Sequence, residues 1–411
     1  MAITDKEQGV WNLEEVYNKI NQGGIWEFTE KFDMWAWGNA QDWRFGAYPS
    51  PANINRSSPT QIGNYGDFSS TAWDLSKTHS NGDVWQNHMM VIRNGELWCW
   101  GQNQSGQLGK NDKAQRASPV RVGTDSNWAA VGIGGRTTFA TKTDGTLWGW
   151  GSNGPGQLGM NNRTSYSSPV QMMSDKTWGT SADNLTIGGD TENGSTRSFL
   201  IDSSNQLWAA GYNYTGELGL NDKTQRSSPT QVPGSTWKMT TTGDGWSNAI
   251  KTDGTLWGMG KSHSYGGGFP GPNKSSPVQI GTNTNWANIS GCWKNSLGVQ
   301  TDGTLYAWGE GVFGSMGDNS TGNNNSPTPV GTDTTWSTTA RPQNTYVTAA
   351  AIKSDGTLWA WGNNYFGQLG QNEGPGADGP GGYSSPAQIP GTSWARISSS
   401  GREAFIATSL Q

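Results

Sequence analysis

Residues 142–151 read Lys-Thr-Asp-Gly-Thr-Leu-Trp-Gly-Trp-Gly, and this stretch decides the fold. Its second half, Leu-Trp-x-Trp-Gly, places both Trp side chains on one face of an extended chain, because side chains alternate along a β-strand. The Asp144-Gly145 pair lies between two runs rich in β-forming residues. Such a pair predicts a hairpin with a type I′ turn, which needs a positive φ at both central residues.

The Leu-Trp-x-Trp-Gly motif occurs seven times, at intervals of 49 to 63 residues. Close copies lie at 97–101, 147–151 and 358–362, and looser copies at 34–38, 207–211, 256–260 and 305–309. A Ser-Pro pair also occurs seven times in step, and a lone Trp follows most of the prolines by nine or ten residues. Periods near 50 residues are typical of propellers and other repeat arrays.

Each repeat predicts four short antiparallel strands, for example 119–122, 128–133, 137–143 and 146–151. Seven such units arranged radially predict an all-β, closed, seven-bladed β-propeller over residues 31–411. The middle residue of the motif is always small, which suggests a crowded contact with the neighbouring blade. These middle residues are Ala36, Cys99, Gly149, Ala209, Gly258, Ala307 and Ala360.

The two ends of the repeat region complement each other. Phe405–Ser409 matches the strand that precedes Asp-Gly elsewhere, but no Leu-Trp-x-Trp-Gly follows it. Met34–Gly38 is the one copy that lacks a preceding strand. We therefore expect the last blade to combine strands from both ends of the chain, which removes open sheet edges.

Composition limits the classes of function. The chain holds 24 Trp among 411 residues, so aromatic side chains can build a core although hydrophobic residues make up only 32%. The net charge of −5 and the absence of a basic stripe argue against nucleic acid as a partner. We expect no signal peptide and no membrane insertion. Cys99 and Cys292 lie about four blades apart, which predicts two free thiols.

The run at 142–151, followed by Gly-Gln-Leu-Gly at 156–159 and then Ser-Pro, resembles the regulator of chromosome condensation repeat, and the resemblance covers roughly residues 31–411. It is most similar to Trp-rich bacterial and bacteriophage versions. The founder's activity, nucleotide exchange on a small GTPase with chromatin binding, is not expected here. The family's usual His is replaced by Arg136, Ser247, Asn295 and Arg402, and the basic tail is absent.

Residues 1–30 lie outside the repeats and predict an anchor segment with a short helix, in which Asn12 and Glu15 form a capping box. The segment resembles the openings of virion proteins from marine bacteriophages. Its apolar residues are the candidate anchor to a partner subunit. The alternative is that they pack against the propeller's own rim or an end of its channel. They are Trp11, Leu13, Val16, Tyr17, Ile20 and Trp26.

The residues provide no recognisable catalytic, cofactor or metal site. The three His residues lie in separate predicted loops without the spacing of a metal triad. Two loops rich in Asp, Glu and Asn, at 189–194 and 318–325, leave calcium binding open, although neither fits a complete hand-type loop. The repeated Trp residues are expected in the core. Trp43, Trp85, Trp246 and Trp293 fall outside the markers and are the better ligand candidates.

Insertions mark one face as the candidate binding face. Extra residues lie at about 76–88, 180–195 and 341–346, and two other long loops lie at 261–275 and 371–384. If the four strands of a unit alternate in direction, all of these emerge opposite the Asp-Gly turns. Loops on a rigid scaffold usually carry binding sites. The candidate residues on these loops are His79, Trp85, His88, Asp190, Glu192, Arg197, His263, Tyr265, Phe269, Arg341, Glu373, Asp378 and Tyr383.

Three functions fit these patterns. The first is a non-enzymatic bacteriophage virion protein, either a capsid decoration or a tail-associated propeller for host recognition. It would be present in multiple copies, attached to other virion proteins through residues 1–30, and able to meet a host receptor or glycan. The second is a cellular adaptor that binds a protein partner. The third is a glycan-degrading enzyme, which requires a cluster of carboxylates, His, Tyr or Arg on one face.

Overall fold

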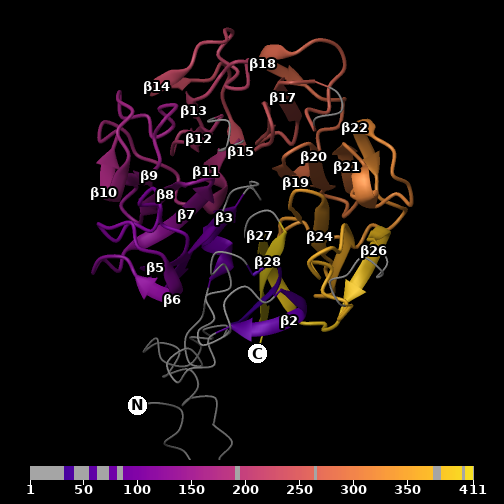
Figure 1. The fold of residues 1–411 in the computed structure, drawn as a ribbon. Helices are drawn as coiled ribbons and strands as arrows, with labels where there is room; N and C mark the ends of the chain where they lie inside the picture. The colour runs from indigo at the N-terminus through magenta and orange to yellow at the C-terminus, as the bar shows by residue number, and fades with distance from the viewer. Residues whose placement is uncertain are drawn as a thin grey trace, which may run out of the picture.

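The computed structural model describes residues 32–40, 55–62, 74–80, 87–189, 195–262, 266–373, 381–399 and 403–410. In these ranges the chain forms seven β-sheets arranged around a central axis (Figure 1). The fold is a seven-bladed β-propeller, as the repeats predicted. The helical elements of the described chain are the 3-10 turns η3 (Leu75–Lys77), η4 (Ala182–Asn184) and η6 (Val312–Gly314). The helix predicted in residues 1–30 lies outside the described residues.

We number the blades in chain order, and each blade runs from the central axis outward. Blade 1 contains β4 (His88–Arg93), β5 (Glu96–Gly101) and β6 (Arg116–Arg121). Blade 2 contains β7 (Trp128–Gly134), β8 (Thr137–Lys142), β9 (Leu147–Gly151) and β10 (Tyr166–Met172). Blade 3 contains β11 (Leu185–Gly188), β12 (Arg197–Ile201), β13 (Leu207–Gly211) and β14 (Arg226–Gln231). Blade 4 contains β15 (Trp237–Thr242), β16 (Trp246–Lys251), β17 (Leu256–Gly260) and β18 (Lys274–Gln279).

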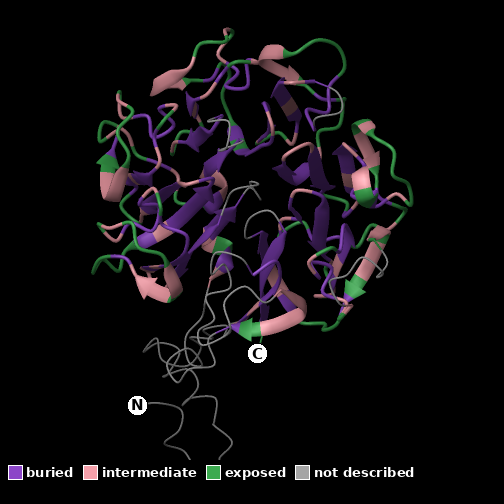
Figure 2. Ribbon diagram, in the orientation of Figure 1, coloured by how far each residue is buried: buried purple, intermediate pink, exposed green. Residues whose placement is uncertain are grey.

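Blade 5 contains β19 (Trp286–Cys292), β20 (Asn295–Gln300), β21 (Leu305–Gly309) and β22 (Asn324–Pro329). Blade 6 contains β23 (Gln343–Asn344), β24 (Thr348–Ile352), β25 (Leu358–Gly362) and β26 (Tyr383–Ile389). Blade 7 contains β27 (Trp394–Ser399), β28 (Ala404–Leu410), β1 (Phe32–Gly38) and β2 (Arg56–Ile62). The inner strands are mostly buried, whereas the outermost strands are half-buried or exposed (Figure 2).

Blade 7 closes the ring with strands from both ends of the chain, which confirms the sequence prediction. β1 pairs with β28 along its whole length, from Phe32 opposite Leu410 to Gly38 opposite Ala404. β28 in turn pairs with β27, so the C-terminal strand lies in the middle of its sheet. The backbone groups of β1 and β28 are therefore not left as an exposed edge.

The hairpin turns differ from the predicted type I′. At Asp144-Gly145 only the glycine has a positive φ, of 77°, and its N–H donates to the carbonyl of Lys142 at 2.9 Å. This is a type I turn followed by a left-handed glycine. Asp144 Oδ1 accepts from the N–H and the hydroxyl of Thr146 (2.9 and 2.7 Å), which holds the aspartate in its ordinary φ range. In blade 1, Asn94 and Gly95 both have positive φ.

The small middle residue of the motif is crowded by its own blade, and not by the neighbouring blade as expected. A Cβ at Gly149 would meet Met172 Sδ at 2.4 Å and Phe139 Cε1 at 3.0 Å, and both of these residues belong to blade 2. Phe139 lies directly opposite Gly149 in the ladder. A large side chain at this position would displace the aromatic ring that fills the space above the strand.

The second Trp of the motif joins neighbouring blades. Trp150 Nε1 donates to the carbonyl of Gln107 at 2.9 Å, and Trp37 Nε1 donates to the carbonyl of Gln368 at 2.9 Å. Each acceptor belongs to the Gly-Gln-Leu-Gly loop of the preceding blade. The last glycine of that loop leaves room for the Trp ring, since a Cβ at Gly109 would lie only 2.9 Å from Trp150 Nε1.

In three blades the innermost strand is interrupted. An isolated bridge forms near its start, between Asp74 and Ile92, Trp178 and Asp202, or Trp336 and Lys353. The chain then makes a short turn before it continues along the axis. In blade 1 the continuation is β3 (Thr78–Ser80), which pairs in parallel with β7 of blade 2. These interruptions coincide with the three insertions found in the sequence.

Candidate functional site

The propeller has two distinct faces. The turn face is formed by the Asp-Gly turns, such as Asp302-Gly303 and Asp355-Gly356. The loop face is formed by the turns between first and second strands and the loops between third and fourth strands. Lys294 and Glu310, one from each kind of connection in blade 5, form an ion pair at 3.2 Å, which places both kinds on the same side. This agrees with the alternating strand directions that the sequence implied.

Exposed aromatic side chains gather on the loop face. Within the described residues the exposed large hydrophobic side chains are Tyr214 (65% exposed), Phe313 (54%), Tyr365 (62%) and Leu410 (44%). The first three occupy the same loop, just before Gly-x-x-Gly, in blades 3, 5 and 6. Tyr and Phe are enriched in protein interfaces because they bury much area with few rotatable bonds. The sequence reasoning missed these residues, although an aromatic residue one or two positions before Gly-x-x-Gly was a usable signal.

A stacked aromatic pair lies nearer the axis on the same face. The rings of Trp293 and Tyr346, from adjacent blades 5 and 6, stack with centroids 3.9 Å apart and planes 25° apart. The Lys294 ammonium lies 4.0 Å from the Trp293 ring centroid, and Glu310 holds that ammonium. Both Trp293 and Tyr346 are half-buried. The cluster therefore offers ring edges and charged groups to a partner.

Trp293 is held in an unusual conformation, with a φ of 40°. Its carbonyl accepts from the N–H of Asp244 at 2.6 Å and from Trp246 Nε1 at 2.9 Å, both from blade 4. Non-glycine residues at positive φ cost free energy and are concentrated at functional sites. Of the four Trp residues set apart by sequence, Trp246 is fully buried and packs in the core, whereas Trp293 reaches the surface. Trp43 and Trp85 lie outside the described residues.

Three of the predicted loop residues are not on exposed loops, so their placement was wrong. His88 is fully buried in β4, and Arg197 is fully buried at the start of β12. The Arg197 guanidinium donates to the carbonyls of Gly243 and Trp246 in blade 4, which binds two blades together. Phe269 is 1% exposed and covers Gly258, because its ring fills the space that a side chain there would need.

His79 and Arg341 face the central axis rather than an exposed loop. Arg341 Nη1 lies 2.6 Å from His79 Nε2, and its Nη2 donates to the carbonyl of Thr240 at 2.9 Å. Further contacts reach the carbonyl of Ile289 and the carboxylate of Asp183, so five blades meet at one side chain. Burial lowers the pKa of Arg341 to about 10, while Asp183 opposes that shift. The guanidinium therefore stays charged at neutral pH and links the inner strands of these blades.

Glu373, in the loop between the third and fourth strands of blade 6, and Tyr383, the first residue of β26, are brought together. The Tyr383 hydroxyl donates to Glu373 Oε1 at 2.6 Å, and this hydrogen bond raises the pKa of Tyr383. The remaining candidates lie outside the described residues. They are Trp85, Asp190, Glu192, His263, Tyr265 and Asp378, together with the anchor residues Trp11, Leu13, Val16, Tyr17, Ile20 and Trp26.

Other side chains that could react or bind a metal are buried or dispersed in the described chain. Cys99 and Cys292 are both buried, and the two thiols form no disulfide, as predicted. Among the residues that the structure describes, no three His, Cys, Asp or Glu side chains are grouped so as to hold a metal ion. In the same ranges no helix is long and apolar enough to cross a membrane.

Comparisons with known proteins agree with this architecture. The family model of the regulator of chromosome condensation (RCC1) repeat matches residues 94–141 and 144–179, and a second RCC1-repeat model matches 348–368. The ultraviolet-B receptor UVR8 of Arabidopsis thaliana is 24% identical over 293 residues. That match spans 69% of this chain and 64% of UVR8.

Two solved structures share the fold across nearly the whole chain. Yeast RCC1 (Prp20), solved with Kap60, has a TM-score of 0.74 at 15% identity and covers 100% of this chain and 95% of its own. Human WBSCR16 has a TM-score of 0.70 at 16% identity, with coverages of 93% and 99%. None of these relatives supports the bacteriophage resemblance of residues 1–30. By its repeated markers and by its fold, the chain is similar to the RCC1-repeat propellers.

Proposed function

We propose that this propeller is a non-enzymatic module that binds another protein through its loop face. The observation that carries the proposal is the set of exposed aromatic side chains, Tyr214, Phe313 and Tyr365, within the same loop of three blades. Exposed apolar groups on one side of a rigid scaffold are typical of an interaction surface. The rigid Trp293–Tyr346 stack adds an ordered centre to the same face.

The relatives support protein recognition by this fold. Yeast RCC1 was solved bound to Kap60, and Saccharomyces cerevisiae Prp20p was characterised for its binding to Gsp1p and histones. We carry over only the general mode, a propeller face that meets a protein. The net charge of −5 on this chain does not favour nucleic acid as its partner.

The partner's setting is a narrower proposal. The resemblance of residues 1–30 to virion proteins suggests that this protein is part of a virion and that its partner is another virion component. The alternative is that this protein is a cellular adaptor that binds a cellular protein. We expect deletion of Met1–Phe28 to leave a folded propeller that no longer joins the particle. Equal binding of both forms to particles lacking the protein would rule out the anchor, and a failure to fold would place the segment in the core. The identity of the neighbouring genes would distinguish the two settings, because a virion protein is expected beside other virion genes.

The loop-face proposal is tested with a triple variant, Tyr214→Ser, Phe313→Ser and Tyr365→Ser. All three side chains are more than half exposed, so the fold should persist. The control is Thr284→Ser, which changes an exposed side chain on the turn face outside both proposed sites. Immobilised full chains are challenged with extract from the producing cells, and retained proteins are identified by mass spectrometry. We expect a protein that wild type and control retain and the triple variant loses; identical retention by all three would contradict the proposal.

A further inference from the structure

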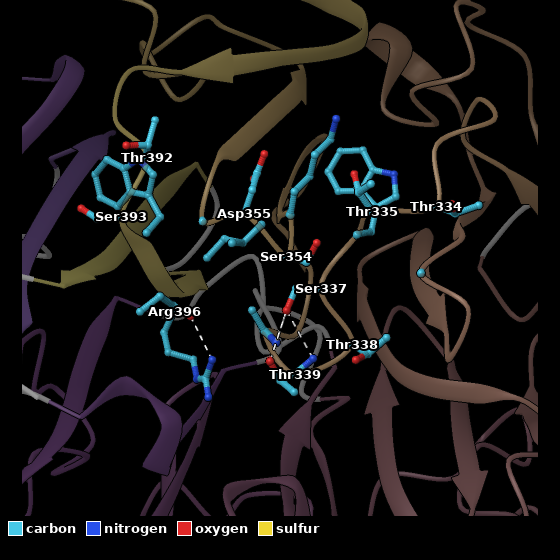
Figure 3. A pocket seen from close by; sticks show the side chains of 18 of the residues that line it. Thr334, Thr335, Ser337, Thr338, Thr339, Ser354, Asp355, Thr392, Ser393 and Arg396 are labelled. Atoms are coloured by element: carbon cyan, nitrogen blue, oxygen red, sulfur yellow. Dashed lines mark hydrogen bonds between the residues drawn. The ribbon is translucent and has the colours of Figure 1, made fainter.

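The turn face carries a cavity of about 630 Å³ between blades 5, 6 and 7 (Figure 3). This volume lies in the range of small-molecule sites. Residues 301–303, 334–340, 352–356 and 392–396, together with Leu410, line it. The cavity lies opposite the exposed aromatics of the loop face, so a ligand bound in it would not compete with a protein bound to that face.

The cavity results from the interruption of the innermost strand of blade 6. In blades 5 and 7 this strand runs unbroken from its first Trp, as β19 and β27. In blade 6 the chain leaves the sheet after Trp336 and resumes pairing at Gln343. The Ser337 hydroxyl accepts from the N–H groups of Thr339 (3.3 Å) and Ala340 (2.9 Å), which holds the departing segment in a turn. The space left at the start of the strand is the cavity.

Hydroxyl groups dominate the polar lining. They come from Thr301, Thr334, Thr335, Ser337, Thr338, Thr339, Ser354, Thr392 and Ser393. Some already serve the fold, as Thr335 does by donating to Asp333 at 2.7 Å. The side chains of Thr334, Thr338 and Thr392 are exposed, and their hydroxyls have no partner in the described chain. A hydroxyl both donates and accepts, so these groups suit a ligand that does the same.

The charged groups of the lining narrow the ligand class. Asp302 and Asp355 each use Oδ1 to hold their turns, which leaves Oδ2 as an acceptor. Lys353 is neutralised by Asp333 at 2.5 Å, and Arg396 donates from Nη1 to its neighbour's carbonyl and keeps its other donors. Two carboxylates beside one available guanidinium disfavour an anion. Carboxylates, hydroxyls and a guanidinium together match the alternating donors and acceptors of a sugar.

We propose that this cavity binds a neutral polyhydroxylated ligand, a free sugar or the end of a glycan. The exposed hydroxyls of Thr334 and Thr392 contact the ligand from two sides, while Asp302 and Asp355 accept from its hydroxyls. Leu410, which is 44% exposed, supplies an apolar contact for the ring carbons. The propeller would then bind another protein on its loop face and a sugar on its turn face.

The probes are six neutral sugars: glucose, galactose, mannose, N-acetylglucosamine, maltose and lactose. Saturation-transfer NMR on the full chain detects binding, and calorimetry gives the Kd of any sugar that binds. The variant is Thr334→Val with Thr392→Val, which removes two hydroxyls while it keeps their shape. The matched control is Thr284→Val, because Thr284 is also exposed and also lies two residues before a marker Trp, but does not line this cavity.

We expect at least one sugar to bind, and the double variant to weaken it about tenfold, equivalent to about 1.4 kcal/mol. The control should bind as wild type does, and all forms should melt alike. No binding by any of the six sugars at about 10 mM would overturn the proposal. Equal binding by the double variant would overturn it too. The loop-face triple variant should bind sugar normally, so failure of one proposal leaves the other standing.

Discussion

The guanidinium of Arg341 donates to the imidazole of His79, with Nη1 and Nε2 2.6 Å apart. Because a guanidinium has no acceptor, Nε2 must carry the lone pair and the proton sits on Nδ1. Nδ1 lies 2.9 Å from the carbonyl of Leu185, to which it therefore donates. These two residues are 262 positions apart in the chain, and their contact joins blade 6 to β3, which continues the innermost strand of blade 1.

Replacing Arg341 should destabilise the propeller. In Arg341→Met, His79 Nε2 and the carbonyls of Thr240 and Ile289 lose a donor, which should lower the free energy of unfolding by roughly 2–4 kcal/mol. Arg341→Lys should restore only part of it, since one ammonium cannot reach the same acceptors as a planar fork. Urea unfolding of the two variants and wild type measures these differences in the free energy of unfolding. A methionine variant as stable as wild type would show that the polar contacts add nothing beyond packing.

His88 should make stability depend on pH. Burial lowers its pKa to about 3, against 6.5 for the exposed side chain. The unfolded chain therefore binds a proton that the native chain excludes, and stability is lost as pH falls from 6.5 toward 3, by up to roughly 1.4 kcal/mol per unit. Thr138 donates its hydroxyl proton to the carbonyl of Gln107, so it must accept from His88 Nε2, which therefore carries the imidazole proton. His88 Nδ1 keeps its lone pair and has no hydrogen-bond partner in the described chain.

The measurement for His88 is the difference in unfolding free energy between wild type and His88→Gln, taken at several pH values. Glutamine does not titrate, so the loss between pH 6.5 and 4 should be smaller in the variant. Parallel curves for the two proteins would mean that other groups account for the acid sensitivity.

Gly109 and Gly123 offer a matched pair for the contact between blades. Both have a positive φ, 69° and 62°, but a Cβ at Gly109 would lie 2.9 Å from Trp150 Nε1, whereas one at Gly123 would meet nothing within 4 Å. Gly123→Ala should cost about 1 kcal/mol from backbone strain alone. Gly109→Ala should cost about 1–3 kcal/mol more, because the indole that donates to Gln107 must move. Equal melting temperatures would show that the loop yields freely.

Ring closure depends on β28. Removing Phe405–Gln411 takes away the strand that pairs with both β1 and β27. We expect the truncated chain to aggregate or to lose cooperative unfolding, since two edges become exposed. Size-exclusion chromatography and a thermal melt are the measurements. A monomeric truncated protein with an unchanged melt would argue against closure through the shared blade.

The thiols should react only after unfolding. Burial raises the pKa of Cys99 to about 12, so the thiolate that reacts with aromatic disulfide reagents is scarce at neutral pH. Native protein at pH 8 should show almost no labelling, and denatured protein should show both Cys99 and Cys292. Rapid labelling without denaturant would indicate local opening of β5 or β19.

The sequence by itself determined the ring of seven blades, the closure through both termini and the absence of a disulfide between the two cysteines, because these follow from repeat spacing and strand alternation. It did not determine the turn type at Asp144-Gly145, which depends on the side-chain bonds to Thr146. Nor did it place His79, Arg341 or Arg197, whose partners come from other blades. The turn-face cavity, likewise, exists only where three blades meet. Local periodicity specifies each blade, whereas what lies between blades depends on contacts that no single repeat contains.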